Sequence, residues 1–224
     1  MTRTSLDLSP QTINYLLENN YAECEALKLC REESAKHPRA NYQITPEQGS
    51  FLSFLTRMND SRIAIEIGVF TGYSALLTAR ALTQNAGPGA KLFALDISHE
   101  YLNMAQKYWE MANLEKYIEP LQGNAIQSLQ NLIDKGYEGR VDQIFIDADK
   151  AAYIDYYELG HKLLRKSGIM IFDNMFLSGR AINPQNDDKA ALALNELAKF
   201  AKQDKRYDIS LISVGDGILL AKKK

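Results

Sequence analysis

Short apolar runs alternate with amphipathic segments from residue 62 to residue 173, and this rhythm constrains the fold more than any other feature of the chain. Strands are predicted at 62–67, 91–96, 117–121, 141–147 and 168–173. Helices are predicted between them, at 73–82, at 98–111 with Ser98 as the N-cap, around 126–132 and at 151–164. Strand–helix repeats with apolar strands are typical of a parallel sheet covered by helices on both faces.

Both ends of the chain depart from this rhythm. Gly215-Asp216-Gly217 separates predicted strands at 207–214 and 218–221. This is a hairpin pattern, so one of the last strands is expected to be antiparallel. A helix is predicted before it, at about 190–200.

Before residue 58 the pattern is helical. Ser9-Pro10 is typical of a helix start, the next helix should end before Pro38, and Thr45 to Gln48 combines an N-cap, an early proline and a capping-box glutamine. We interpret 1–224 as one domain, with N-terminal helices at 1–58 covering the site and an α/β core at 59–224.

Composition excludes several classes of protein. The 224 residues carry a formal net charge of -2, which provides no bulk attraction to nucleic acid. Cys24 and Cys30 have no metal-ligand partners nearby in the sequence, as expected for thiols in a reducing compartment. No segment has the apolar length of a signal peptide or a membrane span, so we expect a cytoplasmic protein without a membrane partner.

The first predicted strand runs into a glycine turn, Gly68-Val69-Phe70-Thr71-Gly72, which lets backbone approach a ligand closely. The turn lacks the Gly-x-Gly-x-x-Gly spacing of dinucleotide-binding loops. Asp96 ends the next strand, where it would accept hydrogen bonds from ribose hydroxyls. This combination favours S-adenosylmethionine over a dinucleotide, and Glu66 within an apolar strand implies a buried polar partner. The alternative is structural: the glycines end a strand, and Asp96 caps the following helix.

Two later strands also end in acidic residues. Asp147 and Asp149 follow one strand, and Asp173-Asn174 follows the next. If these strands are neighbours, Asp147, Asp173 and Asn174 converge, and three such oxygen ligands suit Mg²⁺, Ca²⁺ or Mn²⁺. The alternative is that these residues are ordinary helix caps and turn pairs.

Four ordered motifs resemble the caffeoyl-CoA O-methyltransferase group and, more distantly, catechol O-methyltransferase. They are 65–74, 147–150, 173–174 and 214–217, and Ala35 to Pro38 resembles the N-terminal region of that group. The resemblance implies the class I methyltransferase fold: a doubly wound, mostly parallel seven-stranded sheet with one antiparallel strand near the C-terminus and extra N-terminal helices. It also implies a homodimer.

The resemblance further implies roles for individual residues. The divalent cation, most simply Mg²⁺, would be bound by Asp147, Asp173 and Asn174, and Lys150 matches the lysine proposed as general base. Asp147, Tyr156 and Ser178 would lie near the substrate. The residues implied around S-adenosylmethionine, or its product S-adenosylhomocysteine, are Glu66, Gly68, Val69, Ser74, Asp96, Ala125 and Asp149.

Two departures point away from the plant thioester substrate. Ser178 replaces a substrate-contacting asparagine, and the N-terminal lysine of the plant enzymes has no counterpart. Acceptor choice should be set by 175–187 and the N-terminal helices. We therefore predict cation-dependent methyl transfer to a small phenolic vicinal diol of the catechol, hydroxycinnamoyl or flavonoid type.

Three alternatives remain open. The same chemistry could act on hydroxylated uridine in tRNA, bound by a basic face of Lys36, Arg39, Arg180 and Lys189. A nicotinamide oxidoreductase on a related sheet is the second. A non-catalytic binding protein is the third, and the clustered charge argues against it.

Overall fold

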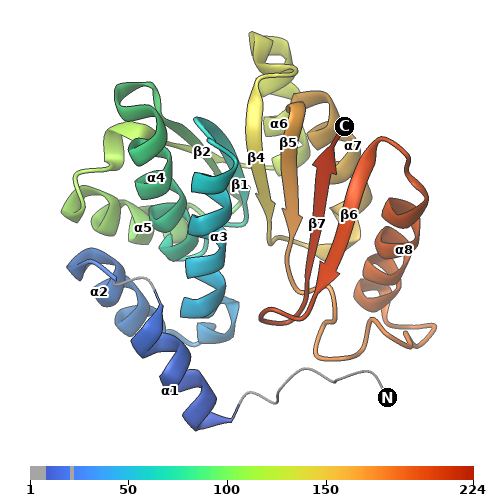
Figure 1. The fold of residues 1–224 in the computed structure, drawn as a ribbon, viewed down its shortest axis with the longest axis horizontal. Helices are drawn as coiled ribbons and strands as arrows, with labels where there is room; N and C mark the ends of the chain where they lie inside the picture. Colours follow the sequence, from blue (N-terminus) through green and yellow to red (C-terminus); the bar gives the residue numbers. More distant parts are fainter. Residues whose placement is uncertain (1–8, 21–22) are drawn as a thin grey trace.

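The computed structural model describes residues 9–20 and 23–224, and within them seven strands form one sheet (Figure 1). The strand order is β3-β2-β1-β4-β5-β7-β6. Strand β7 runs antiparallel to both β5 and β6, and the pairs among β1 to β5 are parallel. The strands are β1 (Ile63–Ile67), β2 (Lys91–Asp96), β3 (Ile118–Gln122), β4 (Val141–Ile146), β5 (Leu164–Phe172), β6 (Tyr207–Ile212) and β7 (Ile218–Lys223). The predicted fold class is confirmed.

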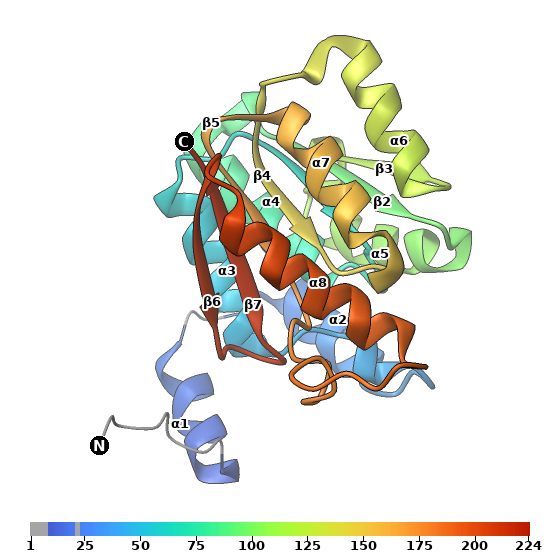
Figure 2. The same cartoon turned by 90° about the vertical axis from the view of Figure 1, so that its right-hand side faces the viewer.

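Helices cover both faces of this sheet. Figure 2 shows helices on both sides of the sheet. Side chains of α2, α3, α4 and α5 form one hydrophobic cluster with one face, and those of α6, α7 and α8 form a second cluster with the other face. The helices are α1 (Pro10–Asn19), α2 (Glu25–Ser34), α3 (Pro46–Met58), α4 (Tyr73–Ala86), α5 (His99–Met111), α6 (Ala125–Leu132), α7 (Tyr153–Leu163) and α8 (Lys189–Gln203). Short helical turns η1 (Ala40–Tyr42) and η5 (Lys150–Ala152) also border the site.

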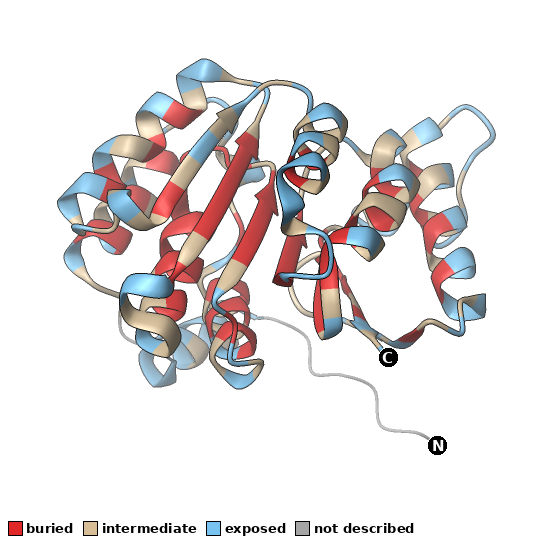
Figure 3. Cartoon of the chain, turned by 90° about the horizontal axis from the view of Figure 1, so that it is seen from above, coloured by how far each residue is buried: buried red, intermediate tan, exposed pale blue. Residues whose placement is uncertain are grey.

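Burial is greatest in the central strands, because helices pack on both faces of the sheet (Figure 3). All six residues of β4 are buried. Helix α1 differs from the others because none of its residues is buried. Among the described residues, no helix is long and apolar enough to cross a membrane.

Helix starts follow the predicted caps with one exception. Ser9 accepts a hydrogen bond from the backbone N–H of Thr12, and Ser98 accepts one from Tyr101. The capping box predicted at Thr45 and Gln48 is wrong. The Thr45 hydroxyl instead donates to Glu47 Oε1 at 2.6 Å, and Gln48 is buried, at 3% exposure.

Strand β5 begins at Leu164, four residues earlier than predicted. Leu164 pairs with Val141, and the register then shifts before Gln143 pairs with Ile169. Ser167 lies within this irregularity at a left-handed φ of 63°. The extra length depends on pairing with β4, so the local pattern of Arg165 to Ser167 does not reveal it.

Gly72 provides a test of how tightly the first helix of the core packs. Its φ is +88°, and a Cβ added there would lie 2.5 Å from Ala105 Cβ and 2.9 Å from Trp109 Nε1. Gly136 is a matched control, because its φ is +84° and nothing lies within 4 Å of an added Cβ. Both alanine variants carry the same backbone strain of about 1 kcal/mol. We expect Gly72→Ala to lose about 1–3 kcal/mol more than Gly136→Ala in urea unfolding, because only Gly72 is overpacked. Equal losses would contradict this packing.

Candidate functional site

The carboxyl ends of four strands lie side by side at one edge of the sheet. The residues that follow β1, β4 and β5 donate their backbone N–H groups to a neighbouring strand at its carboxyl end: Gly68 to Leu95 at 2.9 Å, Asp147 to Ile67 at 2.8 Å, and Asp173 to Ile146 at 3.0 Å. Strand β4 pairs with both β1 and β5. The glycine turn and the two acidic segments therefore meet where open α/β sheets bind ligands.

Gly68 is required by both its backbone conformation and its neighbours. Its φ is +89°, and an added Cβ would lie 2.1 Å from the carbonyl oxygen of Asp147. Phe70, two residues later in the turn, also has a left-handed backbone, at a φ of 49°. The turn thus passes directly against the chain of the acidic segment, which only glycine permits at this point.

Asp96 organises the glycine turn. Its Oδ2 accepts the backbone N–H groups of Val69 at 2.8 Å and Phe70 at 3.1 Å. Its Oδ1 accepts the N–H of Ser98 at 2.8 Å, so the capping alternative raised by the sequence is partly realised. Each carboxylate oxygen can accept more than one hydrogen bond, so the same side chain can also receive a ligand hydroxyl. The carboxylate is oriented by backbone groups on both sides.

Glu66 is fully buried, and only one of its two side-chain oxygens has a hydrogen-bond partner among the described residues. Ser74 donates its hydroxyl to Glu66 Oε1 at 2.7 Å, while Oε2 has no hydrogen-bond partner among the described residues. Burial, with smaller contributions from the charges of Asp147 and Asp96, raises the pKa of this carboxyl to about 8 against the lowering effect of the hydrogen bond from Ser74. A buried orphaned oxygen beside the glycine turn fits a site that receives a polar group from a ligand.

Lys150 joins two of the three predicted metal ligands. Its Nζ lies 3.0 Å from Asp147 Oδ1 and 2.9 Å from Asn174 Oδ1, and it also donates to the Tyr153 hydroxyl at 2.7 Å. A single cationic nitrogen therefore contacts side-chain oxygens that follow both β4 and β5. Asn174 has a φ of 57°, a left-handed conformation that asparagine adopts more readily than most residues.

Asp173 completes this group from a buried position, at 2% exposure. Burial, and then the charge of Asp147, raise the pKa of the Asp173 carboxyl to about 7, whereas the backbone N–H of Asn174, the side chain of Gln48 and Lys150 lower it. Two carboxyls and one amide oxygen form a hard oxygen donor set that fits a divalent cation. Among the described residues no group of three or more His, Cys, Asp or Glu could hold a metal ion, and the predicted donor set differs from such a group by including the amide of Asn174.

The other predicted residues border the same edge. Asp149 accepts a hydrogen bond from the Tyr156 hydroxyl at 2.7 Å. Ala125 is the first residue of α6, directly after β3 and its N-cap Asn124. Ser178 donates its backbone N–H to the carboxylate of Asp216 at 2.8 and 3.0 Å, which ties the loop after β5 to the β6–β7 hairpin.

The sequence pattern did not point to two residues that contact the site. Tyr153 contacts Lys150, and Gln48 lies next to Asp173. No local signal distinguished Tyr153 from Tyr157, whose hydroxyl instead donates to Asp204 at 3.1 Å.

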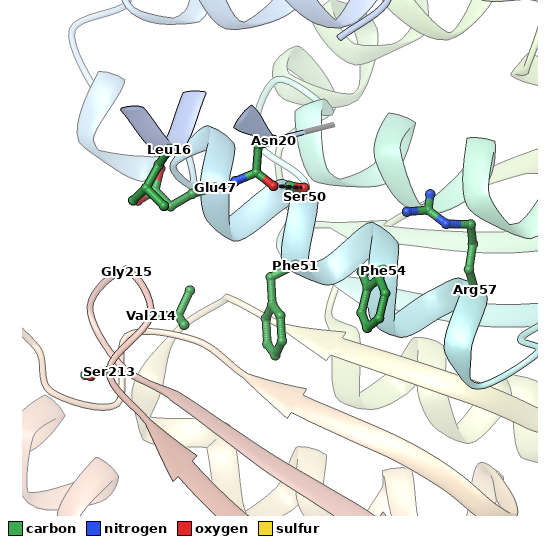
Figure 4. A pocket seen from close by; sticks show the side chains of 10 residues that line it. All are labelled: Leu16, Asn20, Glu47, Ser50, Phe51, Phe54, Arg57, Ser213, Val214 and Gly215. Atoms are coloured by element: carbon green, nitrogen blue, oxygen red, sulfur yellow. Dashed lines mark hydrogen bonds between the residues drawn. The ribbon is translucent and has the colours of Figure 1, made fainter. Parts of the chain in front are cut away.

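A separate groove of about 610 Å³ lies between α1, α3 and the β6–β7 hairpin (Figure 4). Phe51 and Phe54 point into it from α3, and a hydrogen bond of 2.7 Å from Ser50 to Asn20 joins α3 to the end of α1. None of the predicted site residues lines this groove. The predicted site residues at the strand ends therefore lie apart from this groove.

A doubly wound sheet with a non-dinucleotide glycine turn and an acidic pair at its carboxyl edge defines a class I methyltransferase. The O-methyltransferase family model matches residues 18–224, so the chain belongs to the O-methyltransferase family. A probable caffeoyl-CoA O-methyltransferase 2 from Dictyostelium discoideum is 40% identical over 213 residues, covering 94% of this chain and 90% of the relative. Caffeoyl-CoA O-methyltransferase 2 from Populus trichocarpa is 34% identical, covering 98% and 91%.

Solved structures agree with this assignment. The O-methyltransferase from Bacillus cereus in complex with SAH matches with a TM-score of 0.85 and 28% identity, covering 96% of this chain and 97% of that one. An SAH-bound methyltransferase from Podospora anserina matches with a TM-score of 0.85 and 25% identity over the whole of both chains. The protein is an S-adenosylmethionine-dependent O-methyltransferase. This removes the oxidoreductase and non-catalytic alternatives.

The raised pKa of Glu66 predicts how stability changes with pH in the protein without cofactor. The folded state holds this proton up to about pH 8, whereas the unfolded chain loses it near 4.5, so folding binds a proton between these values. Stability contributed by protonated Glu66 is therefore lost as pH rises from about 5 to 8. We expect Glu66→Gln to gain stability relative to the wild type by at most about 1.4 kcal/mol per pH unit in this window. Urea unfolding of both proteins at several pH values measures this, and a pH-independent difference would show that Glu66 is ionised when folded.

Proposed function

We propose that this enzyme transfers the methyl group of S-adenosylmethionine to one hydroxyl of a small aromatic vicinal diol, with a divalent cation at Asp147, Asp173 and Asn174. The observation that carries the proposal is the position of Lys150 Nζ, within 3.0 Å of oxygens of both Asp147 and Asn174. These two oxygens are thus close enough to share one cation. The named plant and Dictyostelium relatives act, by their names, on a phenolic thioester, which supports an aromatic acceptor.

The proposed donor site is the glycine turn with its neighbours. Glu66, Gly68, Val69, Ser74, Asp96, Ala125 and Asp149 are the residues proposed around it. The turn offers backbone that a ligand can approach closely, Asp96 is oriented by three N–H groups, and Glu66 keeps one oxygen unpaired. The donor supplies a methyl carbon on a sulfonium, whose carbon–sulfur bond breaks as the acceptor oxygen forms the new carbon–oxygen bond, leaving S-adenosylhomocysteine.

At the acceptor, this chain would position the hydroxyl and take up its proton. A phenol has a pKa near 10, so little oxyanion exists at neutral pH. A divalent cation held by the three oxygen ligands would favour the deprotonated form of a hydroxyl bound to it. With a divalent cation in place beside Asp147 and Asn174, Lys150 would act as the neutral amine that receives the released proton, and the Tyr153 hydroxyl, at 2.7 Å, holds the end of this side chain in place.

Acceptor choice is proposed to depend on Tyr156, Ser178 and the loop at 175–187. Tyr156 is 4% exposed and its hydroxyl is bonded to Asp149, so it would present a ring face or edge rather than a free hydroxyl. The backbone N–H of Ser178 is bonded to Asp216, which leaves its side chain to interact with an acceptor. The homodimer expected from the resemblance stays a prediction.

The tRNA alternative gains little from the arrangement of basic side chains. Arg180 forms an ion pair with Asp188, and the Arg39 guanidinium lies 5.5 Å from the ring centre of Tyr42. Two of the four residues of the suggested basic face thus already have partners. A small phenolic acceptor is the simpler proposal.

The cation is tested by removing one ligand charge. We expect Asp173→Asn to lower kcat/KM for a catechol by at least about a hundredfold, because the site loses a charged ligand. S-adenosylhomocysteine affinity, measured by calorimetry, should stay within about threefold of wild type. Chelator should abolish wild-type activity, and added Mg²⁺ should restore it.

Asp155→Asn is the matched control, since it removes an exposed carboxylate on α7 close in sequence to the acidic segment. It should retain wild-type activity and the same response to chelator. Undiminished catechol methylation by the wild type in chelator would disprove the cation role.

The acceptor class is tested by a methyl-transfer screen with Mg²⁺ present. Catechols, flavonoids and hydroxycinnamoyl thioesters should yield labelled product, and compounds with a single hydroxyl should react much more slowly, because only a vicinal diol offers two oxygens to one cation. Hydroxyuridine RNA is the comparison substrate. Preferential labelling of this RNA, falling steeply with added salt, would replace the phenolic assignment by the tRNA alternative.

A further inference from the structure

Helix α2, outside the α/β core, is hydrogen-bonded to the glycine turn at Thr71. The hydroxyls of Ser34 and Thr71 lie 2.6 Å apart, and the Ser34 hydroxyl also bonds the Cys30 carbonyl at 2.6 Å. Cys30 Sγ donates to the Thr71 carbonyl oxygen at 3.4 Å. All three residues are at most 1% exposed, so water cannot replace these bonds if they are lost.

The preceding turn residue, Phe70, is held by a second set of contacts. Its ring makes edge-to-face contacts with His37 at 5.2 Å, Tyr42 at 5.9 Å and Tyr101 at 5.1 Å between ring centroids. His37 follows α2, Tyr42 lies in η1 and Tyr101 lies in α5. These contacts offset the cost of the left-handed backbone of Phe70.

The turn residues next to Thr71 are also the ones that are hydrogen-bonded to Asp96. The N–H groups of Val69 and Phe70 both bond Asp96 Oδ2, and Thr71 is the next residue. A shift of Thr71 would move these N–H groups and, with them, the carboxylate they orient. The Ser34–Thr71 bond thus connects an N-terminal helix to the orientation of Asp96 through three consecutive residues.

We propose that Ser34 and Thr71 are positioning residues for the methyl donor, which hold residues 68–72 and Asp96 in the binding conformation before the donor arrives. This inference rests on the proposed function, in which this turn forms the donor site. It assigns α2, expected from the sequence to cover the acceptor, a role in donor affinity. Because preorganisation lowers the cost of binding, its loss should appear in affinity rather than in the rate at saturation.

The test is Ser34→Ala, which removes one hydroxyl without leaving a large cavity. We expect the dissociation constant for S-adenosylhomocysteine and the KM for S-adenosylmethionine to rise about five- to tenfold. The kcat at saturating donor should stay within about twofold of wild type. Ser34→Thr keeps the hydroxyl and should retain wild-type affinity.

Ser53→Ala is the matched control, because Ser53 is equally buried in a helix and its hydroxyl accepts a hydrogen bond from Arg57 in the same helix. It should leave donor affinity unchanged. Thr71→Val should weaken affinity as Ser34→Ala does, and the double variant should be no weaker than either single one, since both remove the same bond. A purely structural role would lower the unfolding temperature of Ser34→Ala and Ser53→Ala alike without separating their affinities.

Asp96→Asn distinguishes failure of this inference from failure of the proposed donor site. If Asp96→Asn leaves S-adenosylhomocysteine affinity unchanged, the donor site itself is wrong. If Asp96→Asn weakens affinity while Ser34→Ala matches Ser53→Ala, the donor site stands and the positioning role of Ser34 is overturned. Should Ser34→Ala not fold, the affinities of Thr71→Val and Ser34→Thr decide the question in the same way.

Discussion

The site depends on the backbone hydrogen bonds that continue the parallel ladder one residue beyond β1, β4 and β5. These bonds join Gly68 to Leu95, Asp147 to Ile67 and Asp173 to Ile146. Because they are made by main-chain atoms, they place the first residue after each strand at the same level whatever its side chain. Side chains that are far apart in the sequence are thereby brought to one edge before any of them interacts with another.

Acidic side chains at this edge are accommodated in different ways. Asp96 is satisfied by three backbone N–H groups, and Asp147 is paired with Lys150. Glu66 and Asp173 are the most deeply buried, and burial raises the pKa of each. Each of these two carboxyls thus avoids part of the cost of a buried charge by keeping its proton to a higher pH than in the unfolded chain.

The sequence pattern located the elements well where burial repeats locally. Strand β2 has its predicted bounds, and Ser98 caps α5 as expected. The pattern located elements less well where pairing decided the outcome. The first residues of β5 form a strand only because they pair with β4 across a register shift. The capping box at Thr45 does not form, since Thr45 bonds Glu47 and Gln48 is buried.

The sequence by itself determined the order of strands and helices, the glycine turn and the acidic strand ends, because each of these is encoded by residues adjacent in the chain. It also predicted which acidic residues would lie together, given neighbouring strands. Only the tertiary structure decided that Lys150 contacts Asn174, that Tyr153 rather than Tyr157 reaches Lys150, and that Ser34 bonds Thr71. These contacts depend on strand register and helix docking, and periodicity reports which face is buried but not what lies against it.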